Sequence, residues 1–309
     1  MKKILTAVAF TIAAISPALV VASEPAPALT YHPQAGEELD AETSENYEAF
    51  LTSLSPLQGD IELKKAHAML NVSPSYYFLS TKDAQAVLED AWGNPPDANV
   101  LGMIFPAGAS PLDYDAWGAT IYFSDDGYVS DDDANAINYE ELLAEIQDSQ
   151  RADNEWRTNN GYDPIDLIGW AETPYYNADT HKLFWAKELK FGDMETNTLN
   201  YDIRVLGRRG ALVISFIATM NELDDIRSAA PAVLDMAQFN SGATYAEYKP
   251  GSDKKAAYGI AGLIGGAAIA KKTGLLAALL IFGKKFIVVI LAGLAAAFGA
   301  VKRFFGANR

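Results

Sequence analysis

The sequence predicts an α+β protein, built mainly on an antiparallel sheet with packed helices and followed by a C-terminal helical membrane tail. Strand-like apolar runs follow one another directly, which favours antiparallel pairing with helices packed on the sheet. Residues 24–253 carry 13 Lys and Arg against 40 Asp and Glu, a net charge of −27. Residues 254–309 carry nine Lys and Arg and no acid. A membrane with anionic lipids attracts such a basic, apolar tail.

The first 57 residues are expected to lie outside the folded domain. Residues 1–22 have the order of a secretory signal peptide, with two lysines, an apolar run and small residues before Glu24. An uncleaved N-terminal anchor is the alternative. Residues 23–57 are rich in Pro, Glu and Ala, which predicts an extended acidic arm with a short helix near Glu45–Leu54.

Residues 58–248 are expected to form one soluble α+β domain, since this length is sufficient for a single core. Apolar periodicity and capping signals predict its elements in chain order. The first half is predicted to hold strands over Gly59–Val72, Tyr76–Leu79, Val100–Pro106 and Gly118–Ser124, and helices over Thr81–Trp92 and Asn138–Gly161. The inner side of the second helix is expected to carry Leu142, Leu143, Ile146 and Trp156.

The second half of the domain is predicted to be mostly strand. Strands are expected over Asp166–Glu172 and His181–Phe191, and a hairpin over Thr198–Thr219 with its turn at GRRG, Gly207–Gly210. Asp202 and Arg204 lie two residues apart on one strand face, which indicates a polar ladder. A final helix is predicted over Glu222–Phe239.

Several of these strings together resemble one uncharacterised bacterial family of membrane-anchored proteins, classed as domain of unknown function 2167. The strings are WGNPP, LGMIFP, GYVSDDDA, GWAETPYYNADTHKLFWAKEL, TLNYDIRVLGRRG and YGIAG. The resemblance covers about Gly59 to the end of the chain. It implies an envelope location, a signal peptide and a C-terminal membrane anchor, and it implies no activity and no site residues.

Residues 249–255 are expected to be a linker, and residues 256–309 a basic membrane-anchoring tail. Lysine pairs separate three apolar runs, Ala256–Ala270, Leu275–Gly283 and Phe286–Val301. A two-span helical hairpin and a single span remain open, because each long run is short for the roughly 30 Å hydrocarbon core. Small residues permit close helix contact, so self-association or an envelope partner is expected through Gly259, Gly262 and Gly266.

The acidic stretch SDDGYVSDDDA, Ser124–Ala134, has two interpretations. It is either a turn at Gly127 followed by a helix capped by Ser130, with acids in its first turn, or a surface calcium site. Its spacing does not fit an EF-hand loop. The candidate metal ligands are Asp125, Asp126, Asp131, Asp132 and Asp133.

Two other groups of residues are candidate binding sites. Arg208 and Arg209 could clamp an anion, although turn arginines paired with nearby acids are the simpler interpretation. Trp170 and Trp185 could line a groove for sugar or peptide, or pack in the core. His32, His67 and His181 lack zinc-ligand spacing.

The function expected is a non-enzymatic binding or interaction module of the cell envelope. It would be held in the bacterial inner membrane with its acidic domain on the periplasmic side, and would bind the lipid bilayer and an envelope protein. A domain so acidic would repel nucleic acid, no cofactor fingerprint is present, and the absence of cysteine excludes disulfides. The alternatives are a membrane-tethered hydrolase using carboxylates such as Asp131, Glu172 and Glu188, and a calcium-responsive sensor.

Overall fold

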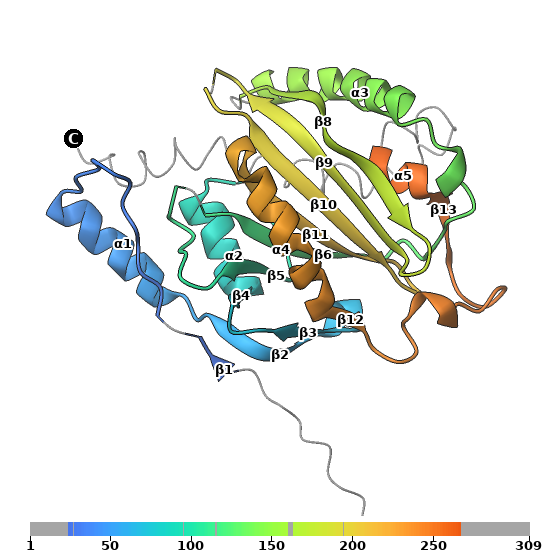
Figure 1. Cartoon of the computed structure of the whole chain (residues 1–309), viewed down its shortest axis with the longest axis horizontal. Helices are drawn as coiled ribbons and strands as arrows, with labels where there is room; N and C mark the ends of the chain where they lie inside the picture. Colours follow the sequence, from blue (N-terminus) through green and yellow to red (C-terminus); the bar gives the residue numbers. More distant parts are fainter. Residues whose placement is uncertain are drawn as a thin grey trace, which may run out of the picture.

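A computed structural model describes residues 24–26, 28–94, 96–114, 116–159, 163–193 and 195–266. The expected signal peptide, and the expected anchoring tail from residue 267 onward, lie outside these residues. The described chain is built around one sheet of eleven strands that runs through the whole molecule (Figure 1).

The large sheet is antiparallel at each of its pairings, as the consecutive strand-like runs predict. Its order is β12-β3-β2-β4-β5-β6-β11-β10-β9-β8, with β1 paired to β2. The strands are β1 (Glu24–Pro25), β2 (Leu57–Leu63), β3 (Ala68–Val72), β4 (Tyr76–Ser80), β5 (Gly102–Pro106), β6 (Gly118–Ser124), β8 (Ile165–Asn177), β9 (Lys182–Phe191), β10 (Thr198–Leu206), β11 (Ala211–Thr219) and β12 (Ala237–Phe239).

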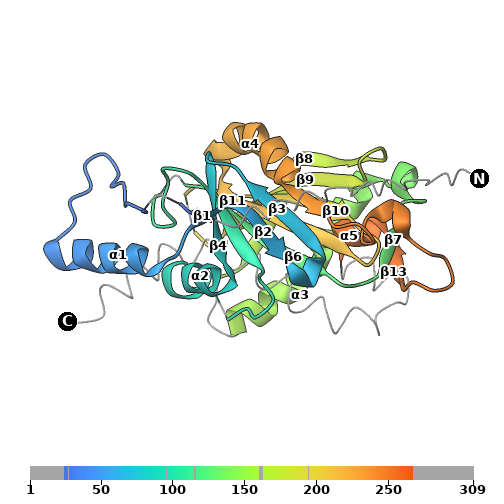
Figure 2. The same cartoon turned by 90° about the horizontal axis from the view of Figure 1, so that it is seen from below.

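Helices cover both faces of this sheet, so the predicted α+β class is confirmed. Helix α4 (Leu223–Met236) lies on one face, and α2 (Thr81–Gln85) and α3 (Tyr139–Asn159) lie on the other (Figure 2). Helix α2 continues as a π-helical turn over Ala86–Ala91, and α1 (Ala41–Ser53) packs beside it. Short 3₁₀ turns lie at Lys64–Ala66, Ala134–Ala136, Met220–Glu222 and Tyr245–Glu247.

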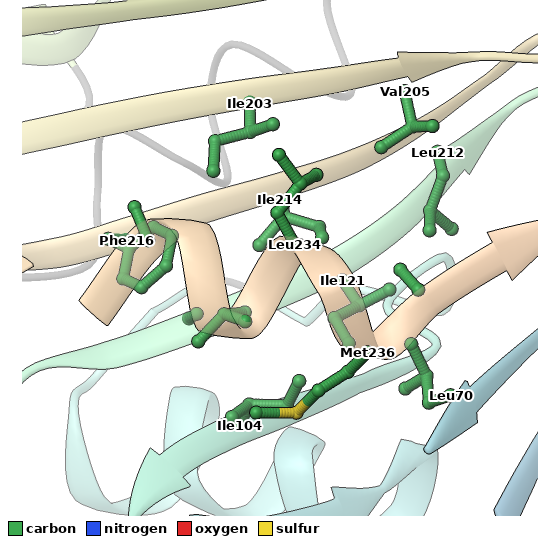
Figure 3. Close-up of a cluster of buried hydrophobic side chains, with 14 of the residues drawn as sticks. Leu70, Ile104, Ile121, Ile203, Val205, Leu212, Ile214, Phe216, Leu234 and Met236 are labelled. Carbon is green, nitrogen blue, oxygen red and sulfur yellow. The ribbon is translucent and has the colours of Figure 1, made fainter. Parts of the chain in front are cut away.

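The core beneath α4 is apolar throughout. Leu234 and Met236 of the helix belong to one buried cluster with Ile203, Ile214 and Phe216 of the sheet (Figure 3). Complete burial of each such side chain contributes about 1.5–3 kcal/mol of transfer free energy. The opposite face carries three apolar clusters: one beneath α1 and α2, one beneath α3 that contains Trp185, and one beneath α3 that contains Ile165.

The exposed edge of the sheet at β8 is partly covered by amide side chains of α3. Gln150 Oε1 accepts from Leu167 N at 3.0 Å, and Asn154 bonds both the N–H and the carbonyl of Ile165 at 2.8 and 2.9 Å. These side chains make the hydrogen bonds to β8 that a neighbouring strand would otherwise make. Unpaired edges invite pairing with other chains, and this part of the edge is protected.

Several details of the predicted elements differ from the structure. Gly59–Val72 is a hairpin of β2 and β3 rather than one strand, turning through His67 with a φ of 51°. The last helix ends at Met236 rather than Phe239, and the chain then pairs as β12 with β3. Trp156 is 49% exposed rather than on the inner side of α3, whereas Leu142 is buried as predicted.

The chain after the domain folds back onto it. In place of the helix expected from Ala256, β13 (Lys255–Gly259) pairs in parallel with β7 (Tyr128–Ser130), and the short helix α5 (Ile260–Gly265) follows. Ile260 and Ile264 are buried in the cluster beneath α3. Within the described ranges, no helix has both the length and the apolar character needed to cross a bilayer.

Candidate functional site

Polar side chains form a band across the sheet face opposite α4. Along β10 side chains alternate between faces, and Leu199, Tyr201 and Ile203 belong to the core under α4. The residues between them therefore face the other side. We call the following six residues the polar band: Thr120 on β6, Ser215 on β11, Asn200, Asp202 and Arg204 on β10, and Lys187 on β9.

The strand register brings the band together. Asp202 stands opposite Ser215 on one neighbouring strand and opposite Trp185 on the other. Asn200 stands opposite Lys187. Directly opposed residues in antiparallel strands have Cβ atoms about 4.5–5.5 Å apart, so these side chains share a small area. The band lies between the apolar cluster beneath α2 and the cluster beneath α3.

Asp202 is the centre of an ionic cluster and is 1% exposed. Lys187 Nζ lies 3.3 Å from its Oδ2 and Arg204 Nη1 lies 3.1 Å from its Oδ1, and the Ser215 hydroxyl donates to Oδ1 at 2.6 Å. Burial alone would raise the pKa of Asp202, but Lys187, Arg204 and Ser215 together hold it below its usual value. The predicted ladder of Asp202 and Arg204 is therefore observed, with Lys187 as a further member.

The cluster carries a surplus positive charge beside an indole ring. Two cations face one carboxylate, and the Arg204 guanidinium carbon lies 4.8 Å from the centre of the Trp185 ring. Lys187 Nζ lies 5.9 Å from the same ring. Cations over an indole face gain about 0.5–2 kcal/mol each. The side chains of Lys187 and Arg204 remain 17% and 11% exposed, so the band meets solvent at its two cations.

Three buried polar atoms at the band have no hydrogen-bond partner among the described residues. They are both side-chain polar atoms of Asn200 and the indole nitrogen of Trp185. Each residue is 1% exposed. Leaving a buried polar group unpaired costs about 1–3 kcal/mol, and native structures contain few such groups.

The carboxyl groups with displaced pKa values, and those expected to be catalytic, are each held by hydrogen bonds or ion pairs. Wherever a carboxyl pKa is displaced among the described residues, it is lowered rather than raised. Of the expected catalytic acids, Glu172 pairs with Arg227, Glu188 accepts from Asn197 at 2.6 Å and Asp131 accepts from Tyr176 at 2.7 Å. Each is held by its own partner.

The acidic stretch Ser124–Asp133 binds the chain that follows the domain. Asp133 accepts from the backbone N–H groups of Ile260 at 2.8 Å and Ala261 at 3.0 Å. Asp126 accepts from the hydroxyl of Tyr258. The Asp125 carbonyl accepts from Lys254 Nζ at 2.9 Å. We call these contacts, together with the pairing of β7 and β13, the junction clasp.

The expected capping role of Ser130 is wrong. Ser130 ends β7, and its hydroxyl donates to Asp132 at 2.5 Å. Helix α3 begins later, where the Asn138 side chain accepts from the N–H groups of Glu140 and Glu141 at 3.1 and 3.3 Å. Of these aspartates, Asp133 does cap a helix, but it is α5, more than a hundred residues away in sequence.

Metal ligation by the five aspartates remains a prediction. Among the residues that the structure describes, no group of three or more His, Asp or Glu side chains converges as metal ligands. Asp126, Asp131, Asp132 and Asp133 each accept at least one hydrogen bond from the protein. A cation at this stretch would compete with those donors.

The arginine pair in the GRRG turn is divided between two partners. Arg208 makes a paired ion contact with Asp253, with Nε–Oδ2 and Nη2–Oδ1 distances of 2.6 and 2.9 Å. This contact holds the pKa of Asp253 far below its usual range. Arg209 lies 3.3 Å from the His67 ring nitrogen at an exposed position. Arg208 therefore fastens the segment just before β13.

The remaining expected site residues lie mainly in packed surroundings. Trp170 donates to the Tyr139 carbonyl at 3.1 Å and packs against the cluster that contains Trp185. His181 contacts the Tyr176 hydroxyl at 3.1 Å. Gly259 and Gly262 pack against residues of their own chain. A Cβ at Gly259 would meet Asp133, and a Cβ at Gly262 would meet Tyr258. Gly266, with a φ of 53°, follows α5.

Sequence reasoning missed Asn200, Lys187 and the partner of Asp133. Asn200 shares its strand face with Asp202 and Arg204, whereas Lys187 lies between the apolar positions Trp185 and Leu189 of the next strand, so alternation along each strand could have marked both residues. That they lie opposite each other follows only from the register of β9 and β10. The link from Asp133 to α5 has no local sequence signal.

Comparison with known proteins gives one family match and a weak structural likeness. A family model described as "Protein of unknown function (DUF2167)" matches residues 55–295. No curated protein matches the chain. The solution structure of cyanobacterial PsbP (CyanoP) from Synechocystis sp. PCC 6803 is similar with a TM-score of 0.34 and 10% identity, over 59% of this chain and 91% of that chain. A likeness this weak supports no conclusion about function.

Proposed function

The chain belongs to the DUF2167 family of proteins of unknown function, and on that premise we propose that it is a membrane-anchored binding protein of the bacterial cell envelope. Its acidic α+β domain would lie on the periplasmic side of the inner membrane and bind another envelope component. Its basic apolar tail would hold it in the bilayer.

The junction clasp is the observation that carries this proposal. The chain leaves the domain through β13 and α5, which are fixed by Asp126, Asp133 and the pairing with β7. Arg208 and Asp253 fasten the preceding segment. A binding domain that must keep one orientation above a surface needs such a fixed exit, since a flexible linker would let it rotate.

Charge supports the same arrangement. The nine basic residues after Asp253 are unaccompanied by any acid, whereas the preceding 230 residues are strongly acidic. Juxtamembrane basic residues gain about 1 kcal/mol each near an anionic leaflet. The same surface repels the acidic domain, so only the tail is drawn to the lipid.

Exposed apolar side chains favour α3 and β8 as the partner-facing side. Among the described residues, Ile168 and Tyr175 on β8 are 47% and 60% exposed, and Trp156 on α3 is 49% exposed. Aromatic residues are enriched at protein interfaces. The amides of α3 protect the first part of the β8 edge, which leaves the part near Tyr175 for a partner.

Site-specific photocrosslinking in living cells tests the partner proposal. A photoreactive residue placed at Tyr175 or Ile168 should capture a distinct envelope protein, identified by mass spectrometry. The matched control is Glu48 on α1, an exposed residue that is distant in sequence from β8. A photoreactive residue at Glu48 should capture little. Recovery of self-contacts alone, or equal capture from both positions, would contradict the proposal.

A further inference from the structure

We propose that the polar band is a binding site for a small carboxylate that also carries a hydrogen-bond donor and an acceptor beside its carboxyl group. Hydroxy- and amino-carboxylates have this chemistry. Such a site would be independent of membrane anchoring, because its residues lie within the folded domain.

The unpaired atoms at the band point to a missing partner. Asn200 has an amide donor and a carbonyl acceptor without partners among the described residues, and the Trp185 indole N–H is a further free donor. Both side chains are buried on the same sheet face, on adjacent strands. A core position that needed only packing would favour an apolar residue, because an unsatisfied amide is costly.

The charge of the band selects an anion. Lys187 and Arg204 both pair with Asp202, which leaves one positive charge uncompensated within the cluster. These are also the band residues with partial exposure, so an incoming carboxylate would meet them first. Guanidinium groups bind carboxylates by paired, charge-assisted hydrogen bonds.

The amide of Asn200 then selects among anions. Its position opposite Lys187 in the register places a neutral donor and acceptor next to the cation. A carboxylate with a hydroxyl or ammonium group on the next carbon can engage both kinds of group, whereas acetate can use only the charged part. A site built to hydrogen-bond a substrate group discriminates strongly against analogues that lack it.

The positions of the band residues are fixed before binding. Asp202 holds both cations through short contacts, Ser215 holds Asp202, and the Trp185 ring lies against Arg204. Side chains that are already ordered lose little further entropy when a ligand binds. Asp202 is thus a positioning residue, and Lys187, Arg204, Asn200 and Trp185 are the groups that would touch the ligand.

Calorimetric titration of the full-length protein in detergent micelles tests the inference. The probes are acetate, lactate, glycine and inorganic phosphate. We expect saturable binding of lactate or glycine at least about tenfold tighter than acetate or phosphate, since a site built to hydrogen-bond a ligand group discriminates strongly against analogues that lack it. Tightest binding of phosphate would overturn the ligand class, and no saturable binding of any probe would overturn the site.

Variants separate a ligand site from a packing defect. Asn200→Leu removes the unpaired amide, so its unfolding temperature should be equal to or above that of the wild type while binding is lost. Lys187→Met should weaken binding at least about tenfold, and Lys190→Met, at an exposed position of the same strand, should leave it unchanged. If Asn200→Leu binds as tightly as the wild type, or unfolds at a clearly lower temperature, water rather than a ligand fills the site.

Discussion

The carboxylate of Asp133 caps the backbone N–H group of Ile260 at 2.8 Å, across 127 residues of sequence. One acidic side chain thereby joins the middle of the domain to the point where the chain leaves it. The basic, apolar part of the sequence begins at this junction, and the contacts there determine how firmly the domain and the tail are connected.

We expect Asp133→Ala to loosen the junction without unfolding the domain. The variant loses the acceptor for two N–H groups of α5, and loss of a helix cap costs about 0.5–2 kcal/mol. Amide hydrogen exchange over residues 255–265 should accelerate, while exchange in β10 and β11 stays as in the wild type. Asp132→Ala is the matched control, because among the described residues Asp132 accepts from its near neighbour Ser130 and from neither N–H group of α5 that Asp133 binds. Equal acceleration in both variants would argue against capping by Asp133.

Gly259→Ala should also loosen the junction, because Gly259 lies directly against the Asp133 carboxylate. A Cβ at Gly259 would collide with Asp133 Oδ1 and displace the carboxylate from α5. The effect of Gly259→Ala and that of Asp133→Ala should therefore be less than additive in a double-mutant cycle of unfolding free energies. Gly169→Ala is the control, since a Cβ there meets nothing within 4 Å. Full additivity would mean that the two residues act independently.

Asp202→Asn should destabilise the domain by about 3–5 kcal/mol, because it leaves Lys187 and Arg204 partly buried without their counter-charge. Urea denaturation measures the loss. The control is Asp235→Asn, since Asp235 is exposed and lies 3.9 Å from Lys182, where a surface pair contributes at most about 1 kcal/mol. Similar losses of unfolding free energy in the two variants would show that the buried cluster contributes no more to stability than a surface ion pair does.

The stability difference between the wild type and Asp202→Asn should depend on pH. The folded-state pKa of Asp202 is lowered from its usual value near 3.8. Its ionised form therefore contributes stability that is fully present above that value and is lost as pH falls toward the folded-state pKa. Denaturation between pH 7 and pH 3 should show the two proteins converging at the acid end. A difference that stays constant below pH 4 would contradict the ionic role.

The sequence predicted the sheet well because its strands carry their own signals. The runs of β5, β6, β10 and β11 are apolar, and GRRG marks the hairpin turn. The predicted strand over Gly59–Val72 failed because Lys64–His67 looks like strand sequence, while His67 adopts a left-handed conformation that usually favours glycine.

The candidate site could be predicted only in part. Asp202 and Arg204 share a strand, so their pairing follows from alternation, but Lys187 joins them only through the β9–β10 register. The junction clasp was missed because local capping rules assign Asp131 to Asp133 to the next helix in sequence. Tertiary packing brought α5 to Asp133 instead, and Asn138 took the local capping role.

Membrane extraction tests the proposed anchoring most directly. Washed membranes from cells that produce the full-length protein would be treated with high salt and with alkaline carbonate, beside membranes from cells that produce a version ending at Gly266. We expect the full-length protein to stay in the pellet through both washes, and the shortened protein to appear folded in the soluble fraction. Release of the full-length protein by salt, or retention of the shortened one in the pellet, would contradict anchoring by the tail.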